Sequence, residues 1–324
     1  MDVLRFILRR ILIAIPVVIA TSIITFIIAA NTGDPLSQLA LNPRTPRSVL
    51  VQKRIDLHLN DSILHRYEIW ASHFIRGDFG KRVNGSSVHT ALFDALGTSL
   101  RMILLAALLA VILGVTVGVI SAVRQYTPLD YSATFASFLF YSIPVFWLAG
   151  LLKIIGIFIN QHVHHTYFFT LGAATPDQTG SFFSHMGETL GHLYLPVLAL
   201  TLVTYASWSR YQRASMLDVM GSDYVRLARA KGLSAQRVLV RHALRNALIP
   251  ITTVVAIDFA SLFSGAVGTE KVFGWQGMGS LLVDGVTHAD TNVVLAWLMV
   301  TAVIVIAFNL LADLLYGVLD PRIR

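Results

Sequence analysis

The sequence predicts an all-α polytopic membrane protein with six transmembrane helices. Its 324 residues are 55% hydrophobic and only 13% charged, whereas a soluble domain carries about 25% charged residues. The hydrophobic residues gather in long runs, and about 20 apolar residues are enough to cross a hydrocarbon core about 30 Å thick. These runs do not alternate in polarity as the strands of a membrane barrel do. Helices are therefore expected, because a helix pairs its own backbone groups in lipid.

The first apolar run, 11–30, follows Arg5, Arg9 and Arg10. It is longer than a signal-peptide core of about 7–15 residues, and no clear cleavage site follows it. An uncleaved first helix is therefore expected. The predicted regions are an N-terminal transmembrane helix at 1–31, an extracytoplasmic loop or subdomain at 32–97, a five-helix core at 98–319 and a cytoplasmic tail at 320–324.

Several of the core spans contain prolines or charged residues within their apolar runs. The third contains Pro144 and Lys153, the fifth has Pro250 in its first turn and Asp258 near its middle, and the sixth is interrupted by Asp313. A carboxylate in the middle of a span is costly, so it usually faces a cavity or a partner. The five predicted core spans are 102–123, 133–159, 193–209, 247–267 and 293–319.

The loop charges orient these spans. The segment between the fourth and fifth spans is rich in cations and holds only two acids, Asp218 and Asp223. By the positive-inside rule this segment and both termini are cytoplasmic, while the external 32–97 segment is long enough to escape the rule. The cations of the cytoplasmic segment are Arg210, Arg213, Arg226, Arg229, Lys231, Arg237, Arg241 and Arg245.

Two short helices are expected in this cytoplasmic segment, at about 222–246. Ser222 or Asp223 begins the first, which ends at Gly232 in the left-handed conformation that favours glycine. Ser234 begins the second, over about 235–246. The basic side chains suit either an acidic protein partner or anionic lipid headgroups, and the residues alone leave both open.

Within this segment the chain reads Ala-Arg-Ala-Lys-Gly-Leu at 228–233 and Arg-His-Ala-Leu-Arg-Asn-Ala-Leu-Ile-Pro at 241–250. These motifs resemble the peptide branch of the inner-membrane permease subunits of binding-protein-dependent ABC importers, specifically the B-type subunit of dipeptide and oligopeptide systems. Arg226 stands where the general family motif has glutamate. The resemblance implies that the loop docks on an ATPase through Asp223, Arg226, Ala228, Arg229, Ala230, Lys231, Gly232 and Leu233.

Further motifs extend the resemblance over nearly the whole chain. They are Gly-Asp-Pro at 33–35, Gly-Asp-Phe-Gly at 77–80, Ser-Ile-Pro-Val-Phe at 142–146, Glu-Lys-Val-Phe-Gly-Trp-Gln-Gly-Met-Gly at 270–279 and Asp-Pro-Arg at 320–322. Gln276 replaces the proline that is usual in the fourth of these motifs. The resemblance implies a type I ABC importer permease fold, and 98–319 as its permease core.

The function implied by the resemblance is that of a translocation subunit of an ATP-driven importer of dipeptides or oligopeptides in the bacterial inner membrane. The implied partners are a second homologous permease, two ATP-binding subunits, an extracytoplasmic peptide-binding protein and membrane lipid. The chain has no P-loop motif, so ATP and Mg²⁺ are expected on the partner ATPases, with no cofactor in this chain. The chain is expected to be a transport subunit and not an enzyme.

Asp258 and Pro144 are the candidate residues of the translocation pathway. Asp258 suits contact with an amino-bearing solute, although a structural aspartate between helices is the alternative reading. A different class of function is a proton-driven secondary transporter using Asp258 and Asp313. A third is a membrane enzyme or a metal site using the external histidines His162, His164 and His165.

Other function classes find no support in the sequence. The chain has no cysteine, which excludes disulfides and thiol chemistry. The sequence lacks the G-x-S-x-G and H-E-x-x-H patterns of two hydrolase classes. Its net charge of +7 reflects the basic cytoplasmic face of a membrane protein, and no soluble basic domain is present to bind nucleic acid.

Overall fold

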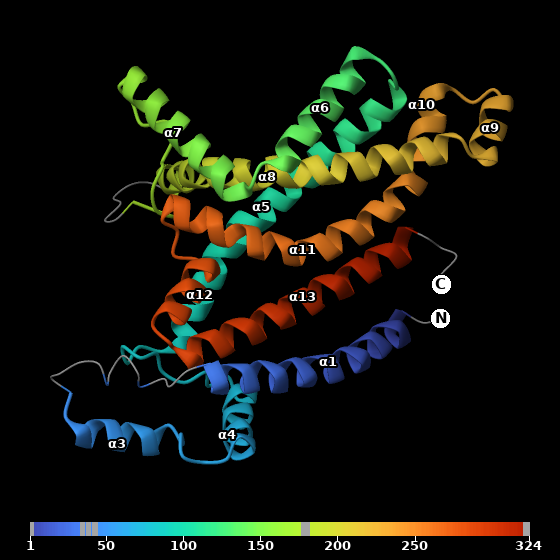
Figure 1. Cartoon of the computed structure of the whole chain (residues 1–324). Helices are drawn as coiled ribbons and strands as arrows, with labels where there is room; N and C mark the ends of the chain where they lie inside the picture. The colour runs from blue at the N-terminus through green and yellow to red at the C-terminus, as the bar shows by residue number, and fades with distance from the viewer. Residues whose placement is uncertain (1–2, 33–35, 37–39, 41–44, 176–181, 320–324) are drawn as a thin grey trace. The chain divides into compact units, whose positions relative to one another are not determined.

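The computed structural model describes the chain except for residues 1–2, 33–35, 37–39, 41–44, 176–181 and 320–324, so the predicted tail lies outside the described residues (Figure 1). The regular secondary structure of the described part consists of helices, and one isolated bridge joins Lys81 to Ser87. Six of its helices are long and apolar enough to cross a membrane, which confirms the predicted fold class. Their candidate spans are Leu8–Asn31, Val88–Val123, Val145–Val163, Met186–Met220, Ala235–Phe259 and Thr291–Leu311.

The chain divides into two compact units. One is made mainly of residues 99–275 with 307–324, and the other of residues 4–98 with 276–306. Two long helices, α5 (Val88–Val123) and α13 (Thr291–Leu319), contribute residues to both units. Each unit has its own apolar core.

The unit of residues 4–98 and 276–306 holds α1 (Val3–Thr32), α3 (Arg47–Asp56), α4 (Ile63–Ile75) and α12 (Met278–Thr287). Its core is built by the start of α5, by α12 and by the start of α13, with Leu92, Met278 and Trp297 among its buried side chains. The indole nitrogen of Trp297 donates to the Met278 carbonyl over 2.8 Å. Helix α5 thus begins at Val88, inside the segment predicted as the external loop.

The external Gly-Asp-Phe-Gly motif forms a tight turn at 77–80. Both glycines have positive φ angles, +80° at Gly77 and +79° at Gly80, which explains why this turn needs them. Asp78 accepts from the Gly80 amide at 3.0 Å and lies 2.8 Å from the ring nitrogen Nδ1 of His73. These two bonds hold the pKa of the Asp78 carboxyl below its ordinary value. Phe79 packs against the apolar core of its unit.

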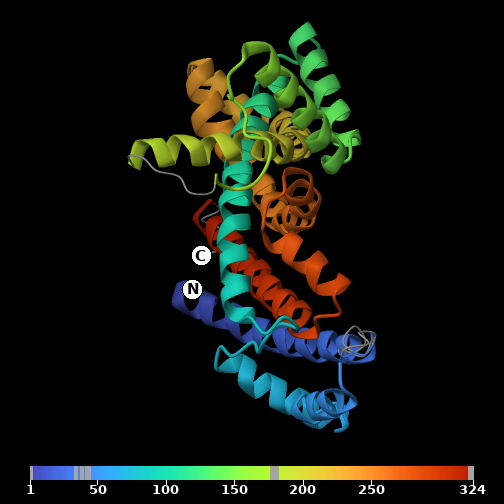
Figure 2. The same cartoon turned by 90° about the vertical axis from the view of Figure 1, so that its left-hand side faces the viewer.

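The other unit holds α6 (Pro128–Ser142), α7 (Val145–Val163), α8 (Phe182–Met220) and α11 (Arg245–Phe273). Helix α8 packs against α6, α7 and α11, and both views show it beside them (Figures 1 and 2). The predicted fourth span, 193–209, is only the middle of α8, which is a much longer helix. Short helices connect α8 to α11: α9 (Asp223–Ala230), α10 (Ala235–Arg237) and the π-helix η1 (Val238–Leu244).

Two sequence predictions about helices were wrong. The predicted third span is not one helix, because α6 ends at Ser142 and α7 begins after Pro144. Proline cannot donate to the preceding turn, and Ile143 before it is extended at φ −86° and ψ 125°. The second cytoplasmic helix does not stop at 246, because α10, η1 and α11 follow each other without a break, so Pro250 lies inside α11.

The Gly114-x-x-x-Gly118 motif of α5 allows a close helix contact, as such motifs do in membranes. A Cβ at Gly118 would lie 2.6 Å from the Ser209 carbonyl oxygen and 2.7 Å from the Gln212 Cβ of α8. A Cβ at Gly114 would meet the Trp208 Cβ at 3.0 Å. Glycine is therefore required at 118 for α8 to lie this close to α5.

Candidate coupling region and translocation pathway

Helix α9 is amphipathic and has one buried face. Val225 and Ala228, three residues apart, are 0% and 6% exposed. The charged side chains Arg226 and Arg229 and the apolar Leu227 are exposed. Residues three or four apart share a helix face, so α9 is seated on the protein by one side and presents a basic, partly apolar side outward.

The seat of α9 is a single apolar cluster. It joins α9 to the last turn of α5, the end of α8, η1 and the first turn of α11. Burying such side chains contributes about 1.5–3 kcal/mol each for the larger ones, so α9 is held firmly to the helices beneath it. The buried members are Ala122, Met216, Val225, Ala228, Val238, Ala243 and Ala247.

The sequence-predicted coupling residues fall into two sets. Ala228 points into the cluster and Leu233 packs partly against it, so these two residues hold the loop in place. Gly232 ends α9 with φ +76°, as predicted, and a Cβ there would meet nothing within 4 Å, so glycine is needed for its conformation alone. The set on the outer surface consists of Asp223, Arg226, Arg229, Ala230, Lys231 and Gly232.

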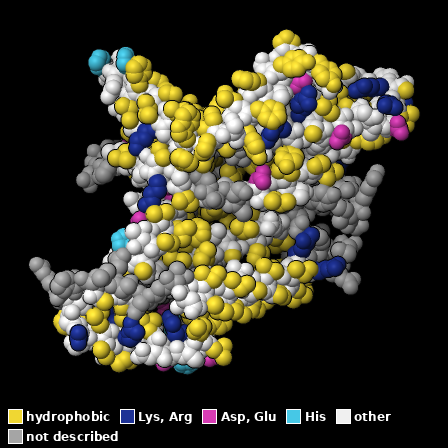
Figure 3. Space-filling model, in the orientation of Figure 1, with side chains coloured by type: hydrophobic (Ala, Val, Ile, Leu, Met, Phe, Trp, Pro, Cys, Tyr) yellow, Lys and Arg dark blue, Asp and Glu magenta, His cyan; other side chains and the backbone are white. Residues whose placement is uncertain are grey.

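Lys and Arg side chains gather over α9 and α10 at this end of the unit (Figure 3). Within α9, Arg226 forms an ion pair with Asp223 at 3.7 Å, and both side chains are well exposed. Such exposed pairs add little stability, so these charges are available to a partner.

A hydrogen bond ties α9 to the start of α11. The Asn246 side-chain amide donates to the Tyr224 hydroxyl and to the His242 carbonyl, each over 3.0 Å. Between α10 and α11 the chain forms the π-helix η1 over seven residues. This geometry is rare, occurs mostly as single turns and is frequent at functional sites. Sequence analysis missed the π segment, because hydrophobic periodicity does not distinguish it from an α-helix.

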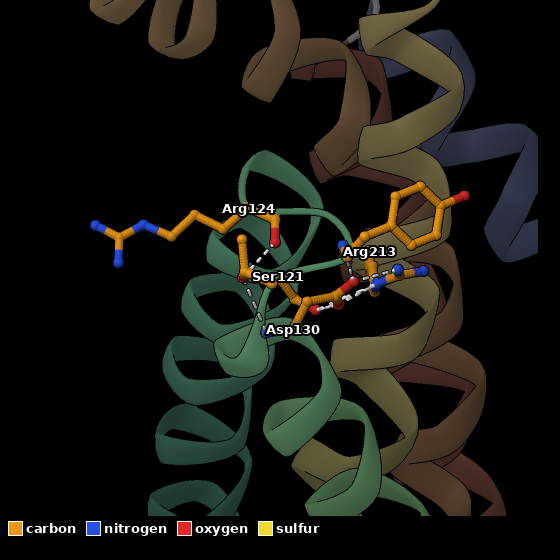
Figure 4. Close-up of polar contacts among 6 residues, drawn as sticks. Ser121, Arg124, Asp130 and Arg213 are labelled. Atoms are coloured by element: carbon orange, nitrogen blue, oxygen red, sulfur yellow. Dashed lines mark hydrogen bonds and ion pairs between the residues drawn. The ribbon is translucent and has the colours of Figure 1, made fainter.

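A partly buried charge pair ties α6 to α8 close to this region (Figure 4). The guanidinium of Arg213 donates from Nε and from Nη2 to the two carboxylate oxygens of Asp130, each over 2.8 Å. Ser121 on α5 donates to the same carboxylate, and the Tyr126 amide adds a bond of 3.0 Å. The pair therefore joins α5, the α5–α6 turn, α6 and α8.

The environment of Asp130 keeps it charged. It is 2% exposed, and burial alone would favour the neutral acid. The hydrogen bond from Arg213 outweighs burial and, with those from Ser121 and the Tyr126 amide, holds the pKa of the Asp130 carboxyl far below its ordinary value. The carboxylate is thus a fixed negative charge at every physiological pH.

Sequence analysis did not single out this pair. A partial signal was present, because Thr127 and Pro128 followed by Asp130 is the pattern of a helix N-terminus, and Thr127 does cap α6. Its partner lies 83 residues away along the chain. No spacing rule predicts that contact.

The two predicted pathway residues lie on different helices. Asp258 on α11 is partly buried, and its Oδ2 accepts from the Trp208 indole nitrogen on α8 over 2.9 Å. Pro144 is exposed at the break between α6 and α7. Arg210 on α8 stacks on Tyr141 and Phe138 of α6, with its guanidinium carbon 4.1 and 4.9 Å from the ring centroids.

Two further expectations concern charged residues. The side chain of Asp313 lies outside the described residues. No group of three His, Cys, Asp or Glu side chains able to hold a metal occurs in the described part of the chain. His162 instead lies 3.0 Å from the Phe158 carbonyl, one turn back in its own helix.

Comparisons with known proteins agree with this architecture. Residues 114–324 match the sequence family described as "Binding-protein-dependent transport system inner membrane component". The "Oligopeptide transport system permease protein OppB" of Mycobacterium tuberculosis (strain ATCC 25618 / H37Rv) is 40% identical over 321 residues, which cover 99% of each chain. The "Dipeptide transport system permease protein DppB" of Escherichia coli (strain K12) is 32% identical over 343 residues, with 99% of each chain covered.

Solved structures agree on the fold. A chain of the MetNI methionine ABC transporter, in an inward-facing conformation, superposes with a TM-score of 0.55 at 16% sequence identity. The match covers 71% of this chain and 96% of that chain. At this level of identity the likeness concerns the fold alone.

Proposed function

The chain belongs to the family of inner membrane components of binding-protein-dependent transport systems, and we propose that the solute it carries is a dipeptide or oligopeptide. It is a multi-pass permease subunit of the inner membrane and not an enzyme, and ATP is bound by separate ATPase subunits. The peptide assignment is supported by the full-length similarity to permeases named for oligopeptides and dipeptides.

We propose that α9 is the element on which an ATPase acts. The observation that carries this is the division of α9 into a face seated on α5, α8 and α11 and an exposed basic face. A partner that pushes on the exposed face moves the seat with it, because packed side chains do not slide freely. The proposed contacts are Asp223, Arg226, Arg229, Ala230, Lys231 and Gly232, with Ala228 and Leu233 supporting them from within.

The charge of this face suits an acidic partner groove. The exposed side chains combine Arg226, Arg229 and Lys231 with the apolar Leu227 and Tyr224, which are 56% and 44% exposed. Exposed apolar side chains rimmed by charge are typical of protein contacts. An anionic lipid surface would satisfy the cations but would leave Leu227 without a specific pocket.

The remaining proposals concern topology, partners and the pathway. Both termini are cytoplasmic, as the loop charges indicate. The working assembly holds a second homologous permease, two ATP-binding subunits, an extracytoplasmic peptide-binding protein and surrounding lipid. Asp258 lies in the pathway between the permeases and meets the amino group of the peptide, while Pro144 lets α6 and α7 take different directions there.

The proton-driven alternative requires transport by this chain alone. Family membership argues against it, because permeases of this family work with an ATPase and a binding protein. The alternative also gives no role to α9, which has one buried face and one exposed basic face.

Leu227→Glu tests the α9 assignment. The change puts a carboxylate in the centre of the proposed contact without touching the apolar cluster. We expect the purified complex to lose its ATPase subunits while the permease stays at normal abundance. Ile75→Glu, at a side chain 84% exposed at the end of α4, is the matched control and should keep them. Full retention of the ATPase subunits by Leu227→Glu would contradict the assignment.

A further inference from the structure

The Asp130–Arg213 pair stands at a point where movement of α9 reaches α6. Arg213 lies in the last third of α8, one turn before Met216, which belongs to the seat of α9. Ser121, which bonds to both members of the pair, precedes Ala122, another member of that seat. The same short stretches of α5 and α8 therefore carry both the seat of α9 and the charge pair.

An ion pair in which Asp130 is buried and Arg213 is only 27% exposed is a poor way to gain stability at such a point. Removing two charges from water costs several kcal/mol per ion, and well-packed apolar residues of similar size are often as stable or more so. The pair instead fixes the position of α6 relative to α8. Its two parallel hydrogen bonds fix the guanidinium in the plane of the carboxylate, so α6 is set at one register along α8.

The far end of α6 is where this register matters. Helix α6 ends at Ser142, directly before the exposed Pro144 and the start of α7. Along its length α6 also meets α8 through the Ser137–Ser209 hydroxyl bond of 2.9 Å and through Arg210, which stacks on Phe138 and Tyr141. A helix held at both ends of its contact with α8 moves as one body with it.

We infer that Asp130 and Arg213 are positioning residues for coupled transport, forming a latch that makes α6 and the α6–α7 break follow the movement of α8 and α9. The inference rests on the proposed role of α9. Without the latch, α9 still binds its partner and α8 still moves, but the first turn of α6 loses its two charge-assisted hydrogen bonds to α8.

The test uses the complete transporter in proteoliposomes with its binding protein and a transported peptide. Asp130→Asn removes the charge and keeps the shape. We expect the number of peptides moved per ATP hydrolysed to fall about tenfold, within the usual 5- to 150-fold range of coupling between sites. Binding of the ATPase subunits should stay unchanged. Arg213→Lys, which keeps the charge but loses the planar fork, should show a smaller fall.

A matched control separates a latch from a merely structural ion pair. Arg82 and Asp290 form a longer ion pair in the other unit, with 4.0 Å between Nε and Oδ2 and with similar exposure: 25% and 7% for its side chains, against 27% and 3% for Arg213 and Asp130. Asp290→Asn should lower thermal stability without changing peptides moved per ATP. An equal loss of coupling in both variants would overturn the latch, and so would normal coupling in Asp130→Asn.

The absence of cysteine from the chain provides a rescue. Cysteines at positions 137 and 209 replace two hydroxyls that are 2.9 Å apart, close enough for a disulfide to form. With Asp130 intact the pair of cysteines should leave transport unchanged. In the Asp130→Asn background, oxidation should restore coupling and reduction should abolish it again. Oxidised and reduced forms that are equally uncoupled would contradict the latch.

Failure of the proposed function gives a different pattern. If the chain does not carry peptides, the unmodified complex moves none, whatever stands at position 130. If α9 is not the ATPase contact, Leu227→Glu keeps its ATPase subunits. The latch alone is wrong when the unmodified complex and Asp130→Asn move the same number of peptides per ATP.

Discussion

Two short helices outside the long spans, α9 and α3, have similar lengths, but only α9 packs a buried face against other helices. Helix α9 buries Val225 and Ala228 in a cluster shared with three long helices. Helix α3 buries none of its residues, and its apolar side chains Val49, Val51 and Ile55 are all exposed. Charge pattern alone therefore does not distinguish the two helices, since both are basic, and under the proposal for α9 the buried face is what marks a coupling element. A buried seat is what allows a surface helix to transmit force.

The largest expected effect comes from destroying that seat. Val225→Asp places an unpaired carboxylate at a position that is 0% exposed, a change that costs about 3–5 kcal/mol when a buried charge has no partner. We expect loss of ATPase binding and a clear fall in the melting temperature of the permease. Val51→Asp on α3, where the side chain is 60% exposed, should change neither. Similar effects of the two variants would remove the distinction between the helices.

A smaller effect is expected at the glycine turns. Gly232 after α9 and Gly77 after α4 have φ angles of +76° and +80°, and a Cβ at either would meet nothing within 4 Å. Alanine at each should therefore cost about the same, roughly 1–2 kcal/mol of backbone strain. Measured stabilities should fall equally, while only Gly232→Ala should weaken stimulation of the ATPase by the loaded binding protein. Unequal stability losses would mean that the two turns differ in more than conformation.

The smallest effect concerns pH. Asp130 and Asp78 both have pKa values below their ordinary ones, through Arg213 in one case and through His73 in the other. A carboxyl group whose pKa is lowered on folding adds stability above its unfolded pKa and loses it as pH falls through the folded value. Both losses lie below about pH 4. The melting temperature should therefore show no step from these two groups between pH 5 and 8.

Collapse of the proton gradient distinguishes the two transport mechanisms. Peptide uptake driven by ATP should persist when a protonophore collapses the proton gradient. Uptake that instead follows the gradient and ignores ATP depletion would favour the proton-driven alternative through Asp258.

The sequence predicted those features that depend on local chemistry. Hydrophobic run length gave six spans, and the positive φ of Gly232 followed from its place after a short basic helix. Each of these rests on neighbours within a few residues, where propensity and backbone sterics decide the outcome.

Other features depended on contacts that local rules do not reach. The break at Pro144 could have been expected from proline's missing amide, but apolar composition on both sides concealed it. Ala228 has the small side chain of a contact surface, yet it faces inward because α9 lies on α5 and α8. The bond between Asp130 and Arg213 needs the folded arrangement of α6 and α8 to exist at all.

Site-specific crosslinking tests the central claim, that α9 is the element on which the ATPase acts, most directly. Because the chain has no cysteine, Arg229→Cys on α9 and Arg76→Cys after α4 each provide a single exposed thiol. In the assembled transporter the thiol at 229 should crosslink to the ATPase subunit and the thiol at 76 should not. A thiol at 229 that reacts only with a lipid-borne probe would contradict the account.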